Sequence, residues 1–574
     1  MVSPPPTLVR FLLAGTVAMV CRTPVFAAET GTGPSPPPNI ILIFADDLGY
    51  GDIGCFRRAS SVGGPSDHDA ATAVMPSSPS PRIDRLASEG ILFRDFVVSS
   101  AVCSASRAAL LTGCLHRRVS IAGALGPKSD HGLHPSERTI AEVCRQRGYA
   151  TACFGKWHLG HDPTFLPPVQ GFDQYLGIPY SNDMWPLHPS TVAARRVNSA
   201  AKSRWPELPM IAATRTPDGT ADYRIINPEM TPADQRRMTG QFTDAAIDFL
   251  RSHGDVPVFI YLAHPMPHVP LHVSDEFRGR TGRGLFADVI AEIDDSVGRL
   301  VDAADALSRH PPSSSHPPSS PQTTLSKPPA TADPDRPSSR RETLFIFASD
   351  NGPWLSYGTH AGSAGPLREG KGTMFEGGAR VPAVMRWTGV IPRGIETELL
   401  CSTIDVLPTI EAIVSSGDAP VHRDVPDGDF RSDRPIDGVD LGPVLRGEPP
   451  PPQLADRFIP GYYQGQLQTI RNDRFKYVFD HRYRTLDGHP GGDYGRPVAY
   501  QHTQSGEALY DLDRDRGETT DVSAENPEVV QRLRAAAERY RETLGDKLTD
   551  RTGSEVRPPG RLKPADERLP LLWP

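Results

Sequence analysis

An unbroken apolar strand that ends in two acids places the strongest constraint on how this chain folds. The segment 39–45, NIILIFA, is apolar after its first residue, and Asp46 and Asp47 follow it directly. A run that is apolar at every position is typical of a strand buried on both faces within a parallel sheet. We therefore expect a sheet covered by helices on both sides, with these acids at the carboxyl end of the strand.

Similar apolar runs alternate with helical segments along the chain. Strand-like runs occupy 149–154, 257–263 and 343–352, and apolar residues at helical spacing mark 82–89, 136–147 and 285–307. Ser136 is the expected N-cap of the second of these helices, which stops before Gly148. The alternation predicts an α/β fold with a large, mostly parallel or mixed central sheet flanked by helices.

The sequence changes character near residue 455. Beyond it, short alternating strands and a helix from about Asn526 indicate a smaller C-terminal α+β subdomain. We expect a signal peptide at 1–28, a large domain at 36–455 and the C-terminal subdomain at 456–574. Within the large domain, the Pro- and Ser-rich stretch 308–341 has almost nothing to bury, so we expect it to be disordered.

The first 28 residues have the features of a secretory signal. Arg10 precedes the apolar run 11–20, and VFAA at 25–28 offers a small-residue cleavage site. The run is too short to span a bilayer and no later stretch qualifies, so we expect export without stable membrane insertion. The net charge of −8 gives no basic surface for nucleic acid. The chain has no Asn-x-Ser/Thr site, which favours a bacterial periplasm or an extracellular medium.

Oxygen-bearing side chains follow two of the predicted strands. Asp46 and Asp47 end the first, and Asp350 and Asn351 end the strand at 343–352. Such pairs can simply cap turns, which is the better interpretation of either pair alone. Two pairs at strand ends together favour a Ca²⁺ or Mg²⁺ site, because these ions prefer oxygen ligands.

Cationic side chains also cluster near predicted strand ends. Lys156 and His158 are two residues apart, so on a strand both would point to the same face. His268 lies between prolines after the strand at 257–263, and Lys371 lies in a glycine-rich segment. Each alone is more simply structural or solvated. Beside a metal, however, they indicate a site for a tetrahedral oxyanion.

Cys103 raises a chemical contradiction. Cys103 and Arg107 are one helical turn apart, so the arginine can reach back beside the thiol. A metal and an adjacent arginine would lower the pKa of the thiol. A thiolate is nevertheless a poor ligand for Ca²⁺, so the predicted site calls for an oxygen nucleophile where the sequence offers sulfur.

Several motifs together resemble those of the sulfatase family, of the arylsulfatase A type within the alkaline-phosphatase-like superfamily. CSASRAALLTG (103–113) resembles the signature whose cysteine a separate enzyme oxidises to formylglycine, and GYATACFGKWHLG (148–160) resembles the second signature. The remaining motifs follow in family order: DDLGYGD, GIPYSND, PHVP, SDNGP and GKGTMFEGGARVP. The resemblance covers about residues 39–540, with Ala105 where the family pattern has proline.

The resemblance implies a role for each candidate residue. The implied metal ligands, for Ca²⁺ or Mg²⁺, are Asp46, Asp47, Asp350, Asn351 and the modified Cys103. The hydrated aldehyde would attack sulfur, with Asp350 as the base and with Arg107 and Lys156 holding the diol. His268 would protonate the leaving oxygen, and His158 would take a proton from the second hydroxyl. Lys371, His268 and Ser181 would contact the sulfate.

Three interpretations remain open at this point. The first is hydrolysis of the sulfate ester of a small molecule or a glycan, with a formylglycine-generating enzyme as the maturation partner. The second is a phosphate or phosphonate ester hydrolase of the same superfamily, since a tetrahedral anion makes similar demands. The third is a non-catalytic protein that binds sulfated glycans, if Cys103 stays a thiol.

Overall fold

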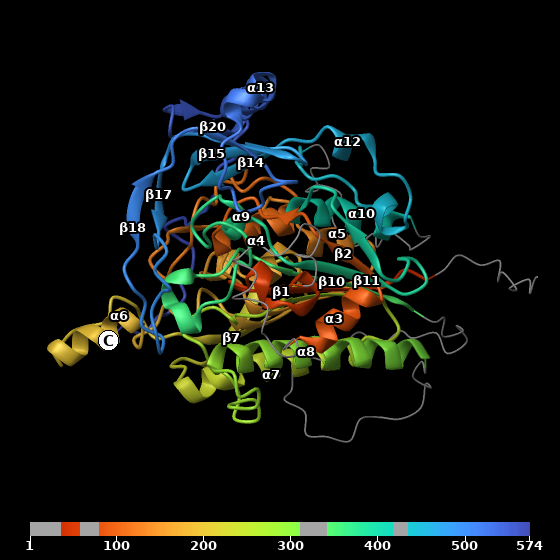
Figure 1. Cartoon of the computed structure of the whole chain (residues 1–574). Helices are drawn as coiled ribbons and strands as arrows, with labels where there is room; N and C mark the ends of the chain where they lie inside the picture. Colours follow the sequence, from red (N-terminus) through yellow and green to blue (C-terminus); the bar gives the residue numbers. More distant parts are fainter. Residues whose placement is uncertain (1–35, 58–79, 310–340, 417–433, 574) are drawn as a thin grey trace, which may run out of the picture. The chain divides into compact units, whose positions relative to one another are not determined.

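A mixed sheet lies at the centre of the computed structural model, which describes residues 36–57, 80–309, 341–416 and 434–573 (Figure 1). In the described residues the sheet has ten strands. In order across the sheet they are β12 (Ile395–Thr397), β2 (Ile91–Phe93), β11 (Ala383–Trp387), β10 (Thr343–Ser349), β1 (Asn39–Ala45), β9 (Val258–Ala263), β5 (Ala150–Lys156), β6 (Gln174–Ile178), β7 (Met210–Arg215) and β8 (Ala221–Asn227).

The middle of the sheet is parallel and its edges contain antiparallel pairs. Strand β1 pairs in parallel with both β9 and β10, and β5 pairs in parallel with β9 and β6. Antiparallel pairing begins at β11 on one side and at β7 on the other. The predicted α/β fold with a mostly parallel or mixed sheet is therefore confirmed.

Alternate side chains of β1 enter two separate cores, one on each face of the sheet. Ile40, Leu42 and Phe44 belong to one core, which is completed by α4 (Cys103–Thr112), α5 (Ile140–Gln146) and α10 (Val406–Ser415). Ile41 and Ile43 belong to the other, with α3 (Pro81–Ser88), α7 (Pro232–Ser252) and α8 (Leu285–Arg309). In Figure 1, α7 and α8 run in green below the sheet, with α4, α5 and α10 above it. Burial on both faces explains the unbroken apolar sequence of the strand.

The prediction that Ser136 is the N-cap of helix α5 is wrong. The helix begins at Ile140, and Thr139 is its N-cap. The Thr139 hydroxyl accepts a hydrogen bond from the backbone of Glu142 at 3.2 Å, and the Glu142 carboxylate accepts from the Thr139 backbone at 2.8 Å. This reciprocal capping box needs an acid three residues after the cap, which Ser136 lacks. The Ser136 hydroxyl instead lies 2.8 Å from His134 Nδ1.

A second, antiparallel sheet forms after residue 455. Its strands, in order, are β14 (Ile459–Tyr463), β15 (Gln466–Arg471), β16 (Phe475–Val478) and β19 (Ala508–Asp511). Helix α13 (Pro527–Leu544) packs on β15 and β16, and a hairpin of β17 (Arg482–Thr485) and β18 (Gln501–Gln504) lies beside this sheet (Figure 1). These elements match the smaller C-terminal α+β part expected from the sequence.

The remaining α-helices and strands of the described residues are short, except for α6. They are α1 (Gly54–Arg57), β3 (Phe96–Val97), β4 (His131–Gly132), α6 (Pro189–Val197), α9 (Glu376–Ala379), β13 (Cys401–Ser402), α11 (Gly442–Leu445), α12 (Pro452–Ala455), β20 (Gly545–Asp546), β21 (Arg551–Thr552) and β22 (Gly560–Arg561). Strand β22 pairs with β4, which joins the end of the chain to its first third.

The predicted domain limits stay predictions. The described residues belong to one compact unit from Pro36 onward. The expected signal peptide (1–28) lies outside the described residues, as does the expected disordered insert 308–341 apart from its ends. None of the helices within the described ranges is long and apolar enough to cross a membrane.

Candidate active site

The acids that end two neighbouring strands meet at the carboxyl edge of the sheet. Strands β1 and β10 pair with Ala45 opposite Ser349, so the residues that follow them emerge side by side. The backbone of Asp47 donates to Asp350 Oδ1 at 3.1 Å. The two strand-end pairs that the sequence singles out therefore form one cluster.

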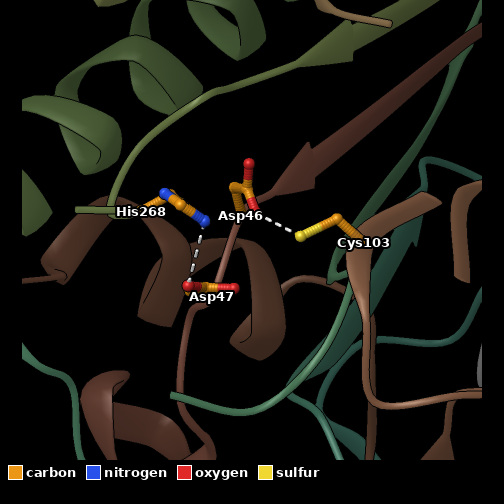
Figure 2. A group of neighbouring side chains, drawn as sticks. All are labelled: Asp46, Asp47, Cys103 and His268. Carbon is orange, nitrogen blue, oxygen red and sulfur yellow. Dashed lines mark hydrogen bonds and ion pairs between the residues drawn. The ribbon is translucent and has the colours of Figure 1, made fainter. Parts of the chain in front are cut away.

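Cys103 and His268 complete this cluster with Asp46 and Asp47. One potential ligand atom from each of the four lies within 4.8 Å of the others, and all four residues are buried. Figure 2 shows Cys103 facing Asp46, with Sγ 3.4 Å from Oδ1, and His268 facing Asp47, with Nε2 3.6 Å from Oδ2. Cys103 is the first residue of α4, so the helix start brings the thiol to the strand ends.

Asn351 offers an oxygen that the described protein groups leave unused. Its amide nitrogen donates to Asp47 Oδ1 at 2.7 Å and to the carbonyl of Gly352 at 2.8 Å. Its Oδ1 is buried and has no hydrogen-bond partner in the described part of the chain. An unpaired buried amide oxygen is costly, but a cation would satisfy it. Together with the neighbouring carboxylates, this donor set fits a hard divalent cation such as Ca²⁺ or Mg²⁺.

Two buried lysines contact the two acids that follow β1. Lys371 Nζ donates to Asp47 Oδ1 at 2.7 Å and lies 3.3 Å from Cys103 Sγ. Lys156 Nζ forms a short ion pair with Asp46 and donates to Ser181 Oγ at 3.1 Å. Predicted anion-binding residues and predicted metal ligands thus share one site.

Arg107 pairs with Asp350. Its Nη2 lies 2.8 Å from Asp350 Oδ2, and its Nη1 donates to the backbone oxygen of Lys156 at 3.1 Å. The guanidinium is fully buried over the ring of Phe44, with 5.6 Å between Cζ and the ring centroid. Arg107 therefore joins α4 to the ends of β10 and β5.

Burial and charge set the protonation states of the acids. Burial raises the pKa of Asp46, but Lys156 and the other cations outweigh it and hold this pKa well below its usual range. Burial and the repulsion of Asp46 raise the pKa of Asp350 to about 7, although Arg107 acts in the opposite direction. Such mutual repulsion between carboxylates would be relieved by a bound cation.

The thiol and the imidazoles have shifted pKa values too. Burial and the charge of Asp46 raise the pKa of Cys103, so the thiol is neutral rather than activated by Arg107. Burial and the charge of Lys371 lower the pKa of His268, against the opposing effect of Asp47. Burial and Lys156 hold the pKa of His158 well below its usual range.

His158 does not lie on a strand, which corrects the expectation that it shares a strand face with Lys156. Strand β5 ends at Lys156, and His158 follows in a left-handed conformation with φ of 62°. Its ring is buried, and neither ring nitrogen has a hydrogen-bond partner in the described ranges. A neutral imidazole with a free nitrogen is able to accept a proton.

Trp354 is a site residue that the sequence analysis missed. Its ring centroid lies 4.7 Å from Lys371 Nζ and 5.6 Å from the ring centroid of His268. An aromatic face beneath an ammonium stabilises the cation and limits its movement. The available signal was its position directly after the SDNGP motif.

Comparisons with known proteins identify the family of this chain. A family model described as Sulfatase matches residues 38–313 and 335–414. Human arylsulfatase A is 34% identical over 530 residues, covering 89% of this chain and 89% of the human protein. Rat arylsulfatase G is 29% identical, covering 91% of this chain and 90% of the rat protein.

A solved structure shares the fold. The PsFucS1 sulfatase from Pseudoalteromonas sp. superposes with a TM-score of 0.66 at 21% identity, covering 88% of this chain and 91% of that one. The family model, the similar proteins and the solved structure are therefore all sulfatases. The chain belongs to the sulfatase family and is an arylsulfatase-like sulfuric ester hydrolase.

Proposed function

We propose that the protein hydrolyses sulfate esters with residue 103 as the nucleophile, after a formylglycine-generating enzyme has converted Cys103 to formylglycine. The observation that carries this proposal is the position of the Cys103 thiol, 3.4 Å from Asp46 and 3.3 Å from Lys371 in a buried cluster rich in oxygen ligands. A neutral thiol is a poor ligand for a hard cation, whereas the hydrated aldehyde carries two hydroxyl groups.

Ca²⁺ is the cation we propose for the site, with Mg²⁺ as the alternative. Its proposed ligands are Asp46, Asp47, Asp350, Asn351 and the converted residue 103. When bound, the ion would polarise the nucleophile and a sulfate oxygen as a Lewis acid. His268 lies within the same cluster, with Nε2 3.6 Å from Asp47 Oδ2, and we assign it to the substrate, as the family resemblance implies.

Residues of the chain carry the two halves of the reaction. In the first, one hydroxyl of residue 103 bonds to sulfur and its proton passes to Asp350, while the ester S–O bond breaks and His268 protonates the leaving oxygen. The bound sulfate anion would raise the low pKa of His268 toward the range that this role needs. Arg107 is paired with Asp350 and Lys156 is paired with Asp46. The two cations would offset the negative charge that develops on the diol of residue 103.

In the second half, the remaining hydroxyl of residue 103 gives its proton to His158. The C–O bond to sulfate breaks, sulfate leaves, and the aldehyde forms again for rehydration by water. Lys371, His268 and Ser181 are the proposed sulfate contacts. Burial lowers the pKa of His158 and keeps its ring neutral, and the negative charge of the bound sulfate ester would raise this pKa as the ring accepts the proton.

The substrate we propose is a sulfated small molecule or a sulfated glycan. Among structures with the same fold, Ps i-CgsB was solved in complex with k-i-k-neocarrahexaose and BT4656 with D-glucosamine-2-N,6-O-disulfate. Those ligands belong to those proteins. They are our reason for including sulfated glycans among the proposed substrates of this chain. From the N-terminal sequence we propose export to a periplasm or the extracellular medium.

Turnover of matched aryl esters tests the proposal. The protein, coexpressed with a formylglycine-generating enzyme and supplied with Ca²⁺, should hydrolyse p-nitrophenyl sulfate far faster than p-nitrophenyl phosphate. The Cys103→Ala variant should lose this activity. Faster phosphate hydrolysis would establish the phosphate ester alternative instead. Binding of sulfated glycans without turnover, together with an unmodified thiol, would establish the non-catalytic alternative.

A further inference from the structure

We propose that Arg484, on strand β17 of the C-terminal hairpin, is a positioning residue that holds Lys371 in the active site. Arg484 Nε donates to the backbone oxygen of Lys371 at 3.1 Å, and Nη2 donates to the same oxygen. The two residues are 113 positions apart in the chain. The inference rests on the proposed role of Lys371 as a sulfate contact.

The backbone around Lys371 is fixed on three sides. Its own N–H donates to the carbonyl of Pro353 at 2.9 Å, and the N–H of Gly372 donates to the carbonyl of Ala101 at 2.9 Å. These acceptors lie two residues after Asn351 and two before Cys103, so the two N–H groups attach the segment to the chain on either side of the proposed metal ligands. The carbonyl of Lys371 is bonded by Arg484, which brings the third support from the C-terminal part of the chain.

The Arg484 guanidinium is itself held by aromatic rings. Its Cζ lies 4.5 Å from the ring centroid of Tyr500 and 6.0 Å from that of Trp354. The Tyr500 hydroxyl accepts a hydrogen bond from the backbone of Ser356 at 3.2 Å. The Trp354 ring also lies beside Lys371 Nζ, so one ring supports both cations. Arginine pairs well with such faces because its planar group stacks while donating.

Gly372 makes room for this contact. It has a φ of 83°, and a Cβ built on it would overlap the guanidinium of Arg484. A residue with a side chain would therefore be both strained and in the way. Because Gly372 has no side chain, the Arg484 guanidinium can reach the backbone oxygen of Lys371.

A shift of the Lys371 backbone would disturb several contacts at once. Lys371 Nζ donates to both carboxylate oxygens of Asp47, at 2.7 and 2.9 Å, and lies 3.3 Å from Cys103 Sγ. Misplacement of a catalytic group by about 1 Å can cost about 100-fold in rate. We therefore expect Arg484→Ala to lower kcat/KM by about 10- to 100-fold, mainly through kcat.

The experiment is a double-mutant cycle in the converted, Ca²⁺-loaded enzyme with p-nitrophenyl sulfate. Arg484→Ala, Lys371→Met and the double variant are compared with wild type, and Arg482→Ala is the matched control because Arg482 is exposed on the same strand. The double variant should be no slower than Lys371→Met alone, since Arg484 acts through Lys371. Added guanidinium should restore part of kcat to Arg484→Ala and leave Arg482→Ala unchanged.

The outcomes separate this inference from the proposed function. If Lys371→Met loses turnover but Arg484→Ala stays within about twofold of wild type, the positioning role is overturned and the proposed function stands. Independent, multiplicative losses in the double variant would also overturn it. If Lys371→Met keeps full turnover, the sulfate-contact role of Lys371 is overturned, and this inference with it. If Arg484→Ala fails to fold, Arg484→Lys takes its place in the cycle. Lysine keeps the positive charge but lacks the two guanidinium donors, so we again expect a lower kcat/KM and no further loss beside Lys371→Met.

Discussion

Arg107 donates two hydrogen bonds to a single oxygen of Asp350, from Nε at 3.1 Å and from Nη2 at 2.8 Å. Both side chains are fully buried. The pair joins the helix that begins at Cys103 to the strand end that bears the predicted metal ligands. It therefore fixes the proposed nucleophile, residue 103, relative to the cluster.

Loss of this arginine should strongly destabilise the fold. Arg107→Met leaves Asp350 buried without its partner, so we expect the free energy of unfolding to fall by about 3–5 kcal/mol. Urea denaturation measures the change. Arg85→Met is the matched control, because Arg85 pairs with Glu89 at the surface and its loss should cost at most about 1 kcal/mol. Equal effects of the two substitutions would contradict the prediction.

Conversion of Cys103 should be visible by mass spectrometry. The tryptic peptide from Asp95 to Arg107 contains the site, and after coexpression with a formylglycine-generating enzyme we expect an aldehyde that resists thiol alkylation. Ala105→Pro, which restores the residue of the family pattern, serves as a reference for the extent of conversion. A fully alkylated thiol in wild type and variant alike would refute the proposed nucleophile.

The metal should stabilise the protein through the unpaired oxygen of Asn351. Ca²⁺ at 100 times its Kd should add about 2.7 kcal/mol to the free energy of unfolding, and a chelator should remove this gain together with turnover. Asn351→Leu should weaken Ca²⁺ binding in calorimetry while changing the metal-free protein less. Unchanged Ca²⁺ affinity in this variant would exclude Asn351 as a ligand.

Asp52 should make the free energy of unfolding depend on pH. Burial raises its pKa to about 7, although the backbone N–H groups of Ser363 and Gly49 act in the opposite direction. The folded state binds this proton more tightly than the unfolded chain does. Protonated Asp52 therefore contributes fully to the free energy of unfolding below about pH 4. This contribution is lost by about 1.4 kcal/mol per pH unit as the pH rises toward 7.

The variant Asp52→Asn isolates this effect. The unfolding free energy of the wild type minus that of the variant should fall from pH 4 to pH 7 and stay constant above. Denaturant titrations at several pH values measure it. A difference that grows with pH would show that the folded carboxyl has a lowered pKa instead.

Sequence patterns predicted the parts of the structure that depend on local chemistry. The apolar run 39–45 revealed a strand buried on both faces because each face needs its own apolar side chains. The same reasoning brought Asp47 and Asp350 together, since neighbouring parallel strands end at one edge of a sheet. The residue pattern therefore indicated the acids at the two strand ends, whereas the pairing of β1 with β10 comes from the structure and the place of Cys103 was implied only by the family resemblance.

Other features depend on backbone conformation or distant contacts that the residue pattern does not reveal. The turn at His158 has a positive φ, which is uncommon for residues other than glycine and which the alternating pattern around Lys156 does not predict. Helix α5 is different, because its cap Thr139 and the acid Glu142 form a capping box, a local signal that the sequence contains and that is preferred to a lone serine. The contact between Arg484 and Lys371 spans 113 residues and has no sequence motif, so only the structure shows it.

The burial of Cys103 also has a consequence for biosynthesis. The side chain is only 1% exposed, and β1 beside it gains its partner β10 only after residues 343–349 have been made. An enzyme that oxidises this thiol must therefore reach it while the first third of the chain is still open. Closing the sheet ends access to the thiol, so the order of synthesis sets the time available for maturation.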